Sequence, residues 1–464
     1  MAIIIKTFAT PGGKYLFDRE TNSLLSVTDT EYTALQKVEN ATATPEDMAI
    51  LQRYIHQGYL KESQLDTIQH PATPYLKHQL SNSIAQLTLQ VCQSCNLRCA
   101  YCAYGGNYEN QRTHSDQVMS LETMKKAADF LMAHSQGVAV VSLGFYGGEP
   151  FLQFDNIKKL VAYISDTYKG RKITYTATTN GTIFTEEMIQ FLLANNFRLG
   201  ISFDGPKDLH DRNRVYASGK GSYDDIMANM AMIKEKYPAL FHNIWFLTTV
   251  APGADFACIN DFYNAEDVLS ESNATANMVN STAAKTEVNY DDHYRVAANY
   301  QMMKALLAEI GFYPKEKTSR LLANRLLQSR RIYHHLGKGT LGKKNHPSGP
   351  CIPGVDRPFV DVCGNILPCE RLGEMADALK IGHIHTGFDL KKAEAILNIG
   401  RTTQEDCLHC WNFSHCDICA AYSDDGSGKL SSTMRLSHCD GLKKRILENF
   451  ATLCLLTEKG ADFT

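Results

Sequence analysis

Three cysteines in one short run are the residues of this chain with the clearest chemistry. Cys95, Cys99 and Cys102 follow the spacing CxxxCxxC within the run Cys-Asn-Leu-Arg-Cys-Ala-Tyr-Cys. A [4Fe–4S] cluster normally takes four cysteine thiolates, so three cysteines leave one iron free to hold a ligand that reacts. Such an iron can bind the amino and carboxylate groups of S-adenosylmethionine (SAM) and pass an electron to its sulfonium. The products of that step are methionine and a 5′-deoxyadenosyl radical.

The CxxxCxxC motif resembles that of the radical SAM superfamily. The alternative interpretation is a structural zinc site, for which pairs of CxxC cysteines are typical. Three cysteines at this spacing would need a fourth ligand, and zinc sites usually draw on two separated pairs. The motif therefore favours a SAM-binding cluster held by Cys95, Cys99 and Cys102.

The composition is typical of a globular protein and excludes several function classes. The chain has 464 residues, enough for two or three domains, with 44% hydrophobic and 21% charged residues. A net charge of −3 gives no sign of nucleic-acid or anionic-membrane binding. No apolar run approaches the ~20 residues of a membrane helix, and the N-terminus lacks a signal-peptide core, so we expect a cytoplasmic protein. Fourteen cysteines in such a protein indicate metal or redox use.

Residues 80–315 are predicted to alternate strands and helices. The strands are expected at Leu87–Val91, Val138–Phe145, Ile173–Thr179, Leu199–Phe203 and Ile244–Val250, and the helices at Leu121–His134, Ile157–Tyr168, Glu186–Asn195 and Asp224–Tyr237. Repeated strand–helix units predict an α/β fold with a parallel sheet. The pattern matches the partial (β/α)6 TIM-like barrel of the radical SAM family, in which the chemistry would sit at the carboxyl ends of the strands.

Polar and glycine residues end each predicted strand of this core. Resemblance to the family implies that Gly147-Gly148-Glu149-Pro150 holds the methionine amino group of SAM, and Glu149 can balance an ammonium. It also implies that Ser202 contacts the ribose and that an arginine pairs with the methionine carboxylate through a bidentate fork. Arg214 fits the family spacing better than Arg212. The remaining residues expected around SAM are Tyr101, Thr179, Asn180 and Asp204.

Residues 1–75 are predicted to form a small winged-helix-like unit. Three strand-like runs are expected at Ile3–Phe8, Lys14–Phe17 and Ser23–Val27. Two amphipathic helices are expected at Thr30–Val38 and Pro45–Gln57, the first capped by Thr28 or Asp29. Such a unit resembles the recognition module of many peptide-modifying enzymes, where a leader peptide adds to an exposed strand edge. The alternative is an N-terminal subdomain without a role in binding.

The C-terminal part is rich in cysteine. Residues 316–350 are basic and are expected to be a linker, residues 351–440 carry most of the remaining cysteines, and residues 441–464 are predicted to contain a closing helix. The spacing in the cysteine-rich part resembles the SPASM domain, which binds two auxiliary Fe–S clusters. One difference is that two residues, where the family usually has three, separate Cys416 and Cys419.

The SPASM resemblance implies how these cysteines are shared. One [4Fe–4S] cluster would be held by Cys407, Cys410, Cys416 and Cys439, and the other by Cys351, Cys369 and Cys419. Where fully ligated family members have a further cysteine, this chain has Asn345, with His346 and Cys363 as weaker candidates. We therefore expect three [4Fe–4S] clusters in all, with an open iron on the second auxiliary cluster. The alternative is a zinc ribbon using the pairs Cys407/Cys410 and Cys416/Cys419 in a binding protein without catalysis.

The whole pattern resembles SPASM-type radical SAM peptide maturases, and most closely the makers of thioether links (sactipeptide and ranthipeptide maturases). The resemblance implies a precursor peptide as partner, with its leader on the N-terminal unit and its cysteine-containing core in the barrel, and an electron donor of the flavodoxin or ferredoxin type. One alternative is formylglycine formation on a sulfatase; its catalytic aspartate would correspond to Glu370. Another is carbon–carbon crosslinking, which needs no substrate thiol.

Overall fold

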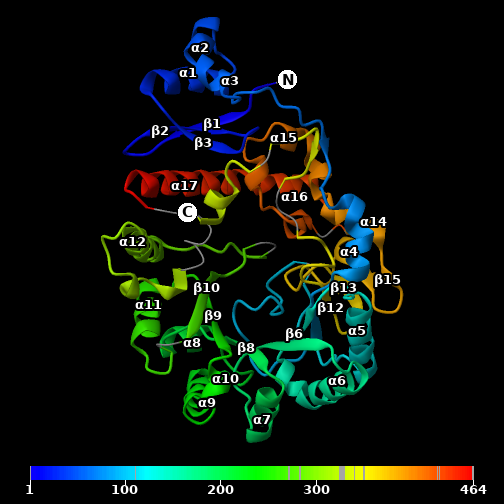
Figure 1. Cartoon of the computed structure of the whole chain (residues 1–464). Coiled ribbons are helices and arrows are strands. Elements are labelled where there is room, and N and C mark those ends of the chain that lie inside the picture. Colours follow the sequence, from blue (N-terminus) through cyan, green and yellow to red (C-terminus); the bar gives the residue numbers. More distant parts are fainter. Residues whose placement is uncertain are drawn as a thin grey trace.

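One ten-stranded sheet runs through the centre of the molecule (Figure 1). The computed structural model describes residues 2–109, 111–269, 272–281, 284–322, 330–338, 340–347, 351–425, 427 and 429–461. Six neighbouring strands of the sheet are parallel, namely β5 (Gln86–Cys92), β6 (Val140–Gly147), β7 (Lys172–Thr179), β8 (Phe197–Ser202), β9 (Ile244–Val250) and β10 (Asn273–Met278). The α/β class and the parallel sheet predicted from the sequence are confirmed, and β10 adds a strand that periodicity did not indicate.

Amphipathic helices cover this sheet and bury its apolar face. They are α5 (Leu121–Ala133), α6 (Phe154–Thr167), α7 (Glu186–Ala194), α8 (Lys207–Asn213), α9 (Tyr223–Lys236), α10 (Pro238–Phe241), α11 (Phe256–Ala265) and α12 (Asp292–Glu309). The cap Ser120 begins α5 by accepting the N–H of Thr123 at 3.0 Å. Leu131 of α5 packs with Leu143 and Phe145 of β6 in one fully buried core.

The cysteine-rich segment continues the same sheet. Its strands are β12 (Phe359–Val360), β13 (Asn365–Leu367), β14 (Gly382–His383) and β15 (Gly387–Phe388). β12 runs parallel to β5, with Phe359 opposite Thr88 and Val360 opposite Leu89, and the remaining pairs are antiparallel. The chain before Cys369 therefore lies beside the strand that leads into the CxxxCxxC motif.

The N-terminal residues form a separate three-stranded antiparallel sheet with helices on one side. Its elements are β1 (Ile5–Ala9), β2 (Lys14–Asp18), β3 (Ser23–Val27), α1 (Asp29–Glu39), α2 (Pro45–Ile50) and α3 (Gln52–His56). Thr28 and Glu31 close a capping box at α1, which identifies Thr28 as the cap. The single helix predicted over Pro45–Gln57 is wrong, because Leu51 leaves helical geometry (ψ 5°) where its side chain is fully buried.

The N-terminal sheet rests on the C-terminal helix α17 (Cys439–Glu458), which lies directly beneath it in Figure 1. The ring of Phe17 packs on Phe450 with centroids 4.8 Å apart. The Tyr15 hydroxyl donates to Glu458 at 2.6 Å. The contact joins the two ends of the chain, and the closing helix predicted from the sequence is confirmed.

The segment expected to be a solvated linker takes part in the fold. β11 (Lys344–Asn345) pairs in parallel with β4 (Thr67–Ile68), and Arg330 pairs with Glu309 at 2.5 Å. The parts of this segment at 323–329, 339 and 348–350 lie outside the described residues. The other helices of four or more residues nearby are α4 (Leu76–Asn82), α14 (Leu390–Leu397), α15 (Gln404–Leu408) and α16 (Ser432–Ser437). No helix in the described ranges has the length and apolarity needed to cross a membrane.

Candidate active site

The cysteine loop begins where β5 ends at Cys92. Cys92 itself is buried and its thiol donates to the Glu149 carbonyl at 3.2 Å, so it is a packing residue. Burial, with smaller contributions from the nearby thiols of Cys99 and Cys102, raises the pKa of the Cys95 thiol to about 12. Burial also raises the pKa values of those two thiols. Three half-buried thiols this close together fit iron, which binds and stabilises the deprotonated form.

Polar groups surround the sulfur atoms of this loop. The amide nitrogen of Asn180 lies 3.9 Å from the sulfur of Cys95, and the backbone N–H of Leu97 donates to the same sulfur at 3.4 Å. Nη1 of Arg214 lies 3.8 Å from the sulfur of Cys99. Donors aimed at sulfur are expected around an iron–sulfur cluster, since they stabilise its negative charge.

Gly147 and Gly148 bring the end of β6 against this loop. A Cβ atom on Gly147 (φ 136°) would lie 2.3 Å from the carbonyl oxygen of Cys92, and one on Gly148 would lie 1.9 Å from that of Ser94. Two hydrogen bonds complete the contact, from Gly148 N to Cys92 O at 2.8 Å and from Glu149 N to Ser94 O at 2.9 Å. The close approach that the glycines allow is therefore to the backbone of the cysteine loop.

Glu149 is fully buried and ties two strand ends together. Its carboxylate accepts the Thr179 hydroxyl at 2.7 Å, the Asn180 N–H at 2.7 Å and the Phe151 N–H at 3.0 Å. Burial raises the pKa of this carboxyl to about 7, and the three donors act in the opposite direction. A carboxylate offers about four acceptor positions, so one remains for the ammonium that the sequence assigned to it. Pro150 follows and begins a short 3₁₀ helix (Pro150–Gln153).

Asp204, just after β8, gathers Tyr101 and Arg214. Its carboxylate accepts the Tyr101 hydroxyl, pairs with Nε of Arg214 at 3.1 Å and accepts the Thr249 N–H at 3.0 Å. The Arg214 guanidinium is 7% exposed and lies over the Tyr101 ring. Arg212 instead donates to the Gly253 carbonyl at the surface. Of the two arginines, Arg214 is thus the one placed beside the cysteine loop.

The predicted SAM-binding residues therefore meet at the carboxyl ends of β5 to β8. Asn180 also donates to Asn96 of the cysteine loop at 2.8 Å, which links the end of β7 to the loop. Ser202 ends β8 and is half-buried. The Arg214 guanidinium can bind the carboxylate of SAM, and the buried Glu149 carboxylate can bind its ammonium. Both groups lie around the thiols of the CxxxCxxC motif, so this set of residues fits SAM bound to a cluster.

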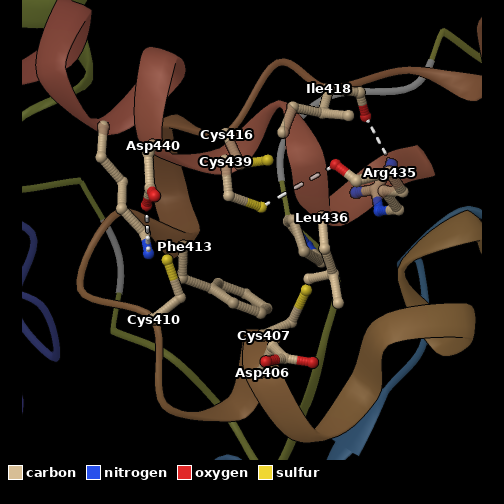
Figure 2. Close-up of a pocket in the computed structure, with 12 residues that line it drawn as sticks. Asp406, Cys407, Cys410, Phe413, Cys416, Ile418, Arg435, Leu436, Cys439 and Asp440 are labelled. Carbon is tan, nitrogen blue, oxygen red and sulfur yellow. Dashed lines mark hydrogen bonds and ion pairs between the residues drawn. The ribbon is translucent and has the colours of Figure 1, made fainter. Parts of the chain in front are cut away.

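Four further cysteines line one cavity of about 220 Å³, shown in Figure 2. These are Cys407, Cys410, Cys416 and Cys439, called here the four-cysteine cavity. Burial raises the pKa of the Cys416 thiol to about 12, and Cys407 and Cys410 raise it further. The cavity is far larger than one zinc ion needs, and its four sulfurs suit a [4Fe–4S] cluster.

Cys351, Cys369 and Cys419 form a second group, called here the three-cysteine site. Burial raises the pKa of Cys369 to about 11, and the Cys419 thiol raises the pKa values of both Cys369 and Cys351. The groups that act on the pKa of Cys363 are Asp361, Lys380 and Glu374, so Cys363 lies apart from this site. The structure thus separates Cys363 from the three cysteines that the sequence grouped.

The two other candidates for a fourth ligand are occupied. His346 is buried, its Nε2 accepts the N–H of Gly400 at 2.9 Å, and its Nδ1 lies 2.6 Å from the Pro347 carbonyl. Neither ring nitrogen is free to bind iron. The side-chain oxygen of Asn345 accepts the His346 N–H at 2.8 Å. His346 is therefore a packing residue in this fold.

Glu370 directly follows Cys369 and is held in an ion pair. Its carboxylate binds the Arg357 guanidinium and lies 3.9 Å from Nε of Arg371. The side chain of Glu370 is 15% exposed. It is therefore close to the three-cysteine site but already carries a cationic partner.

Sequence reasoning missed a buried network between the two cysteine regions. The Arg112 guanidinium pairs with Glu374 at 3.1 Å and stacks 3.6 Å above the Tyr104 ring, while Gln90 donates to Glu374 at 2.5 Å. Nη2 of Arg112 has no partner among the described residues. Arg112 and Glu374 are 262 positions apart, so no local spacing could have paired them.

A single-ion site is not formed by these side chains. Within the described part of the chain, no three His, Cys, Asp or Glu side chains gather closely enough to hold a metal ion. Zinc needs its ligands about 2.0–2.3 Å from one centre, whereas a cubane cluster spreads its thiolates over four irons.

Comparison with known proteins identifies the central part of the chain. Residues 89–264 match the family model of the radical SAM superfamily. The chain carries a radical SAM domain. This match supports an enzyme, with SAM and a [4Fe–4S] cluster as the cofactors of the radical SAM domain. The radical SAM fold predicted from the cysteine motif and the strand–helix repeat is confirmed.

The radical SAM domain has homology to anaerobic sulfatase-maturating enzymes. A cysteine-type enzyme of Clostridium novyi is 33% identical over 154 residues, which cover 32% of this chain and 40% of that protein. An uncharacterized protein of Methanocaldococcus jannaschii is 28% identical over 234 residues, 50% of this chain and 73% of that protein. The chain spans about 40% of the length of the curated sulfatase-maturating enzymes that it matches.

A solved structure supports the fold beyond this domain. The structure of native anSMEcpe with bound AdoMet and Cp18Cys peptide has a TM-score of 0.54 and 21% identity, and covers 79% of this chain and 99% of that one. At this identity the likeness concerns the fold alone.

Proposed function

We propose that this radical SAM enzyme modifies a ribosomally made peptide by joining a cysteine sulfur to a carbon of another residue. The supporting observation is the three-cysteine site, where Cys351, Cys369 and Cys419 lie together while both nitrogens of His346 are already bonded. Three thiolates leave one coordination position of a cluster open, and a substrate thiolate fits such a position. The homology to sulfatase-maturating enzymes and the anSMEcpe structure with a bound peptide support a peptide substrate.

The residues at the strand ends would hold the reactants. When bound, the cluster of the CxxxCxxC motif supplies the electron that splits SAM, and the resulting radical takes a hydrogen atom from the substrate. Arg214 orients the carboxylate of SAM, and Glu149 accepts its ammonium while holding the ends of β6 and β7. Holding the carbon and the thiolate in one site replaces a bimolecular encounter with an oriented one.

The balance of the reaction requires an outlet for one electron. The new bond joins the sulfur to the carbon, while the carbon gives up a hydrogen atom and the thiol a proton. One electron is left over, and it must leave the site. The four-cysteine cavity would hold a cluster that can receive it, and a flavodoxin or ferredoxin would carry electrons to and from the enzyme.

The N-terminal sheet is the proposed site for the leader of the substrate. β3 pairs with β2 on one side only, so among the described residues its other edge keeps unpaired backbone groups. An extended peptide can add to such an edge as a further strand. The Tyr54 hydroxyl of α3 is placed behind this edge, 3.5 Å from the Ser26 carbonyl.

The alternative is formylglycine formation, as in the sulfatase-maturating relatives. That reaction needs a carboxylate to take a proton, and Glu370 is the candidate. Its carboxylate is already bound by the Arg357 guanidinium and would have to leave this partner to reach a substrate, which favours the thioether reaction.

The experiment offers a cysteine-containing candidate precursor peptide to the anaerobically reconstituted enzyme with SAM. Thioether formation predicts the loss of two hydrogens per link, disappearance of free thiols, and no product from a peptide whose cysteines are all serine. Products from that serine peptide would instead indicate carbon–carbon crosslinking. An aldehyde on a sulfatase-type cysteine peptide would indicate formylglycine formation. A matched peptide without its leader tests the N-terminal site, since it should bind more weakly but keep the same chemistry.

A further inference from the structure

Arg435 is a buried cation beside the four-cysteine cavity. Its side chain is among the largest that are fully buried, and the residue is 2% exposed. Nη1 donates to the Ile418 carbonyl at 2.8 Å and Nε donates to the Thr403 hydroxyl at 3.3 Å. Both partners are neutral, and in the described ranges the guanidinium forms no ion pair. Isolated buried charges are costly, so this charge is expected to have an anionic neighbour.

The other charged side chains near the cavity do not fill that role. Asp406 and Asp440 lie on the cavity wall, and Asp440 pairs with Lys443 at 3.8 Å at the exposed rim. On the side of the N-terminal sheet, the buried Arg19 donates to the Leu408 carbonyl at 2.7 Å but is already paired with Glu20 at 2.6 Å. Arg435 is therefore the buried cation whose charge is not balanced by a carboxylate.

The local fold places Arg435 on the wall of the cavity. It lies in α16, which begins at the cap Ser431 and ends just before Cys439. Figure 2 shows its head group beside Ile418, and its backbone carbonyl faces the Cys439 sulfur at 4.0 Å. Thr403, which accepts its Nε–H, lies 3.3 Å from the sulfur of Cys407. The positive charge of Arg435 also lowers the pKa of Cys416, against the larger effect of burial. The pKa of Cys439 is lowered more by Lys443 than by Arg435.

We infer that Arg435 balances the charge of the cluster in the four-cysteine cavity and makes that cluster easier to reduce. The inference rests on the proposed function, in which this cavity holds a cluster that receives the left-over electron. A [4Fe–4S] cluster with four thiolates has a net charge of about −2, and one added electron takes it to about −3. A fixed cation that is itself buried, as Arg435 is, favours the more negative state, because water screens its attraction poorly. Arg435 is thus a positioning residue that acts through the cluster and touches no substrate.

The test is a redox titration of this one cluster, monitored by electron paramagnetic resonance. A full-length background keeps only the four-cysteine cavity by replacing the other cluster cysteines with alanine, namely Cys95, Cys99, Cys102, Cys351, Cys369 and Cys419. Dithionite and mediators supply the electron. Iron and sulfide near four atoms each per chain show that the cavity is loaded. Absence of both would refute the proposed cluster assignment. A loaded cavity whose potential does not respond to Arg435 would refute only the inference about charge, so the two failures are distinct.

Arg435→Gln removes the buried charge, and Lys443→Gln removes an equal charge from the exposed rim of the same cavity. We expect Arg435→Gln to move the midpoint potential to a more negative value, by more than Lys443→Gln does, and Arg435→Lys to keep it near that of the background. A potential unchanged in Arg435→Gln, or moved no more than in the Lys443 variant, would overturn the inference.

If Arg435→Gln binds no iron or sulfide, the test is which of the Arg435 variants keeps the cluster. Retention in Arg435→Lys with loss in Arg435→Gln, at equal helical content by circular dichroism, supports the charge. Equal loss in both variants would show that only the shape of the arginine matters and would also overturn the inference.

Discussion

The contact between Gly148 and the cysteine loop predicts a large effect from one added methyl group. A Cβ atom at residue 148 would lie 1.9 Å from the Ser94 carbonyl oxygen, whereas carbon atoms of real side chains keep at least 3.0 Å, so Gly148→Ala must separate the two segments by about 1.1 Å. The obstacle is backbone and not a flexible side chain. The same shift stretches the hydrogen bonds Gly148 N to Cys92 O (2.8 Å) and Glu149 N to Ser94 O (2.9 Å) beyond bonding distance.

The magnitude follows from these contacts. Two lost hydrogen bonds cost about 2 kcal/mol, or roughly 30-fold in the local opening equilibrium. A displacement of about 1 Å in a catalytic site can cost on the order of 100-fold in rate. We therefore expect Gly148→Ala to release 5′-deoxyadenosine about 100-fold more slowly. We also expect the backbone amides around 147–150 to exchange hydrogen roughly 30-fold faster.

The matched control is Gly342→Ala, because the nearest atom to its added Cβ is 4.0 Å away and its φ is ordinary. Iron determination on both variants separates loss of the cluster from slow turnover of a loaded enzyme. If Gly148→Ala kept iron content, exchange rates and 5′-deoxyadenosine release within twofold of Gly342→Ala, the argument that this glycine positions the loop would be refuted.

Three further predictions concern single residues. Arg214→Gln should weaken SAM binding tenfold or more, since a charged hydrogen bond is worth about 1.5–3 kcal/mol. The control Arg212→Gln, at the surface, should change SAM binding less than twofold, and equilibrium dialysis measures both. Burial raises the pKa of Glu149 from 4.5 to about 7, so the folded apoprotein holds this proton more tightly than the unfolded chain. Its stability should therefore fall by about 3 kcal/mol as the pH rises from 4.5 to 8 in urea titrations, and Glu149→Gln should lack that decline. Cys95→Ala should abolish SAM cleavage, whereas Cys369→Ala should retain part of it but give no modified peptide; equal loss of both activities would argue against separate roles.

Long apolar strands and short cysteine spacings made much of this molecule predictable. The run Val138–Phe145 is apolar almost throughout because β6 is buried in a parallel sheet, and the structure places β6 at Val140–Gly147. Gly147 ends β6, Asn180 directly follows β7, and Asp204 lies two residues after β8. These residues were found because the carboxyl ends of parallel strands meet at one edge.

Features that depend on tertiary contacts could not be predicted in this way. Strands of two or three residues, such as β12 and β13, carry too few positions for any periodicity, so the pairing of β12 with β5 and of β13 with β12 could not be predicted. The break at Leu51 reflects burial of one side chain against the N-terminal core, which overrides helix propensity. The partners of Glu149 also come from separate strands, so its role in joining them needed coordinates.

The arrangement of the cysteine groups gives the enzyme a direction for electrons. β12 pairs with β5. The chain that leads to Cys369 of the three-cysteine site and the strand that leads to the CxxxCxxC motif therefore belong to one sheet. The four-cysteine cavity instead lies under the N-terminal sheet, where Phe17 packs on Trp411 and Arg19 donates to the Leu408 carbonyl. A charge-balanced cluster in that cavity would be the more distant acceptor, and the chain around the cavity packs against the sheet that carries the proposed leader site. Peptide recognition and electron exit would then depend on the same packing, so loss of the cluster should also weaken leader binding.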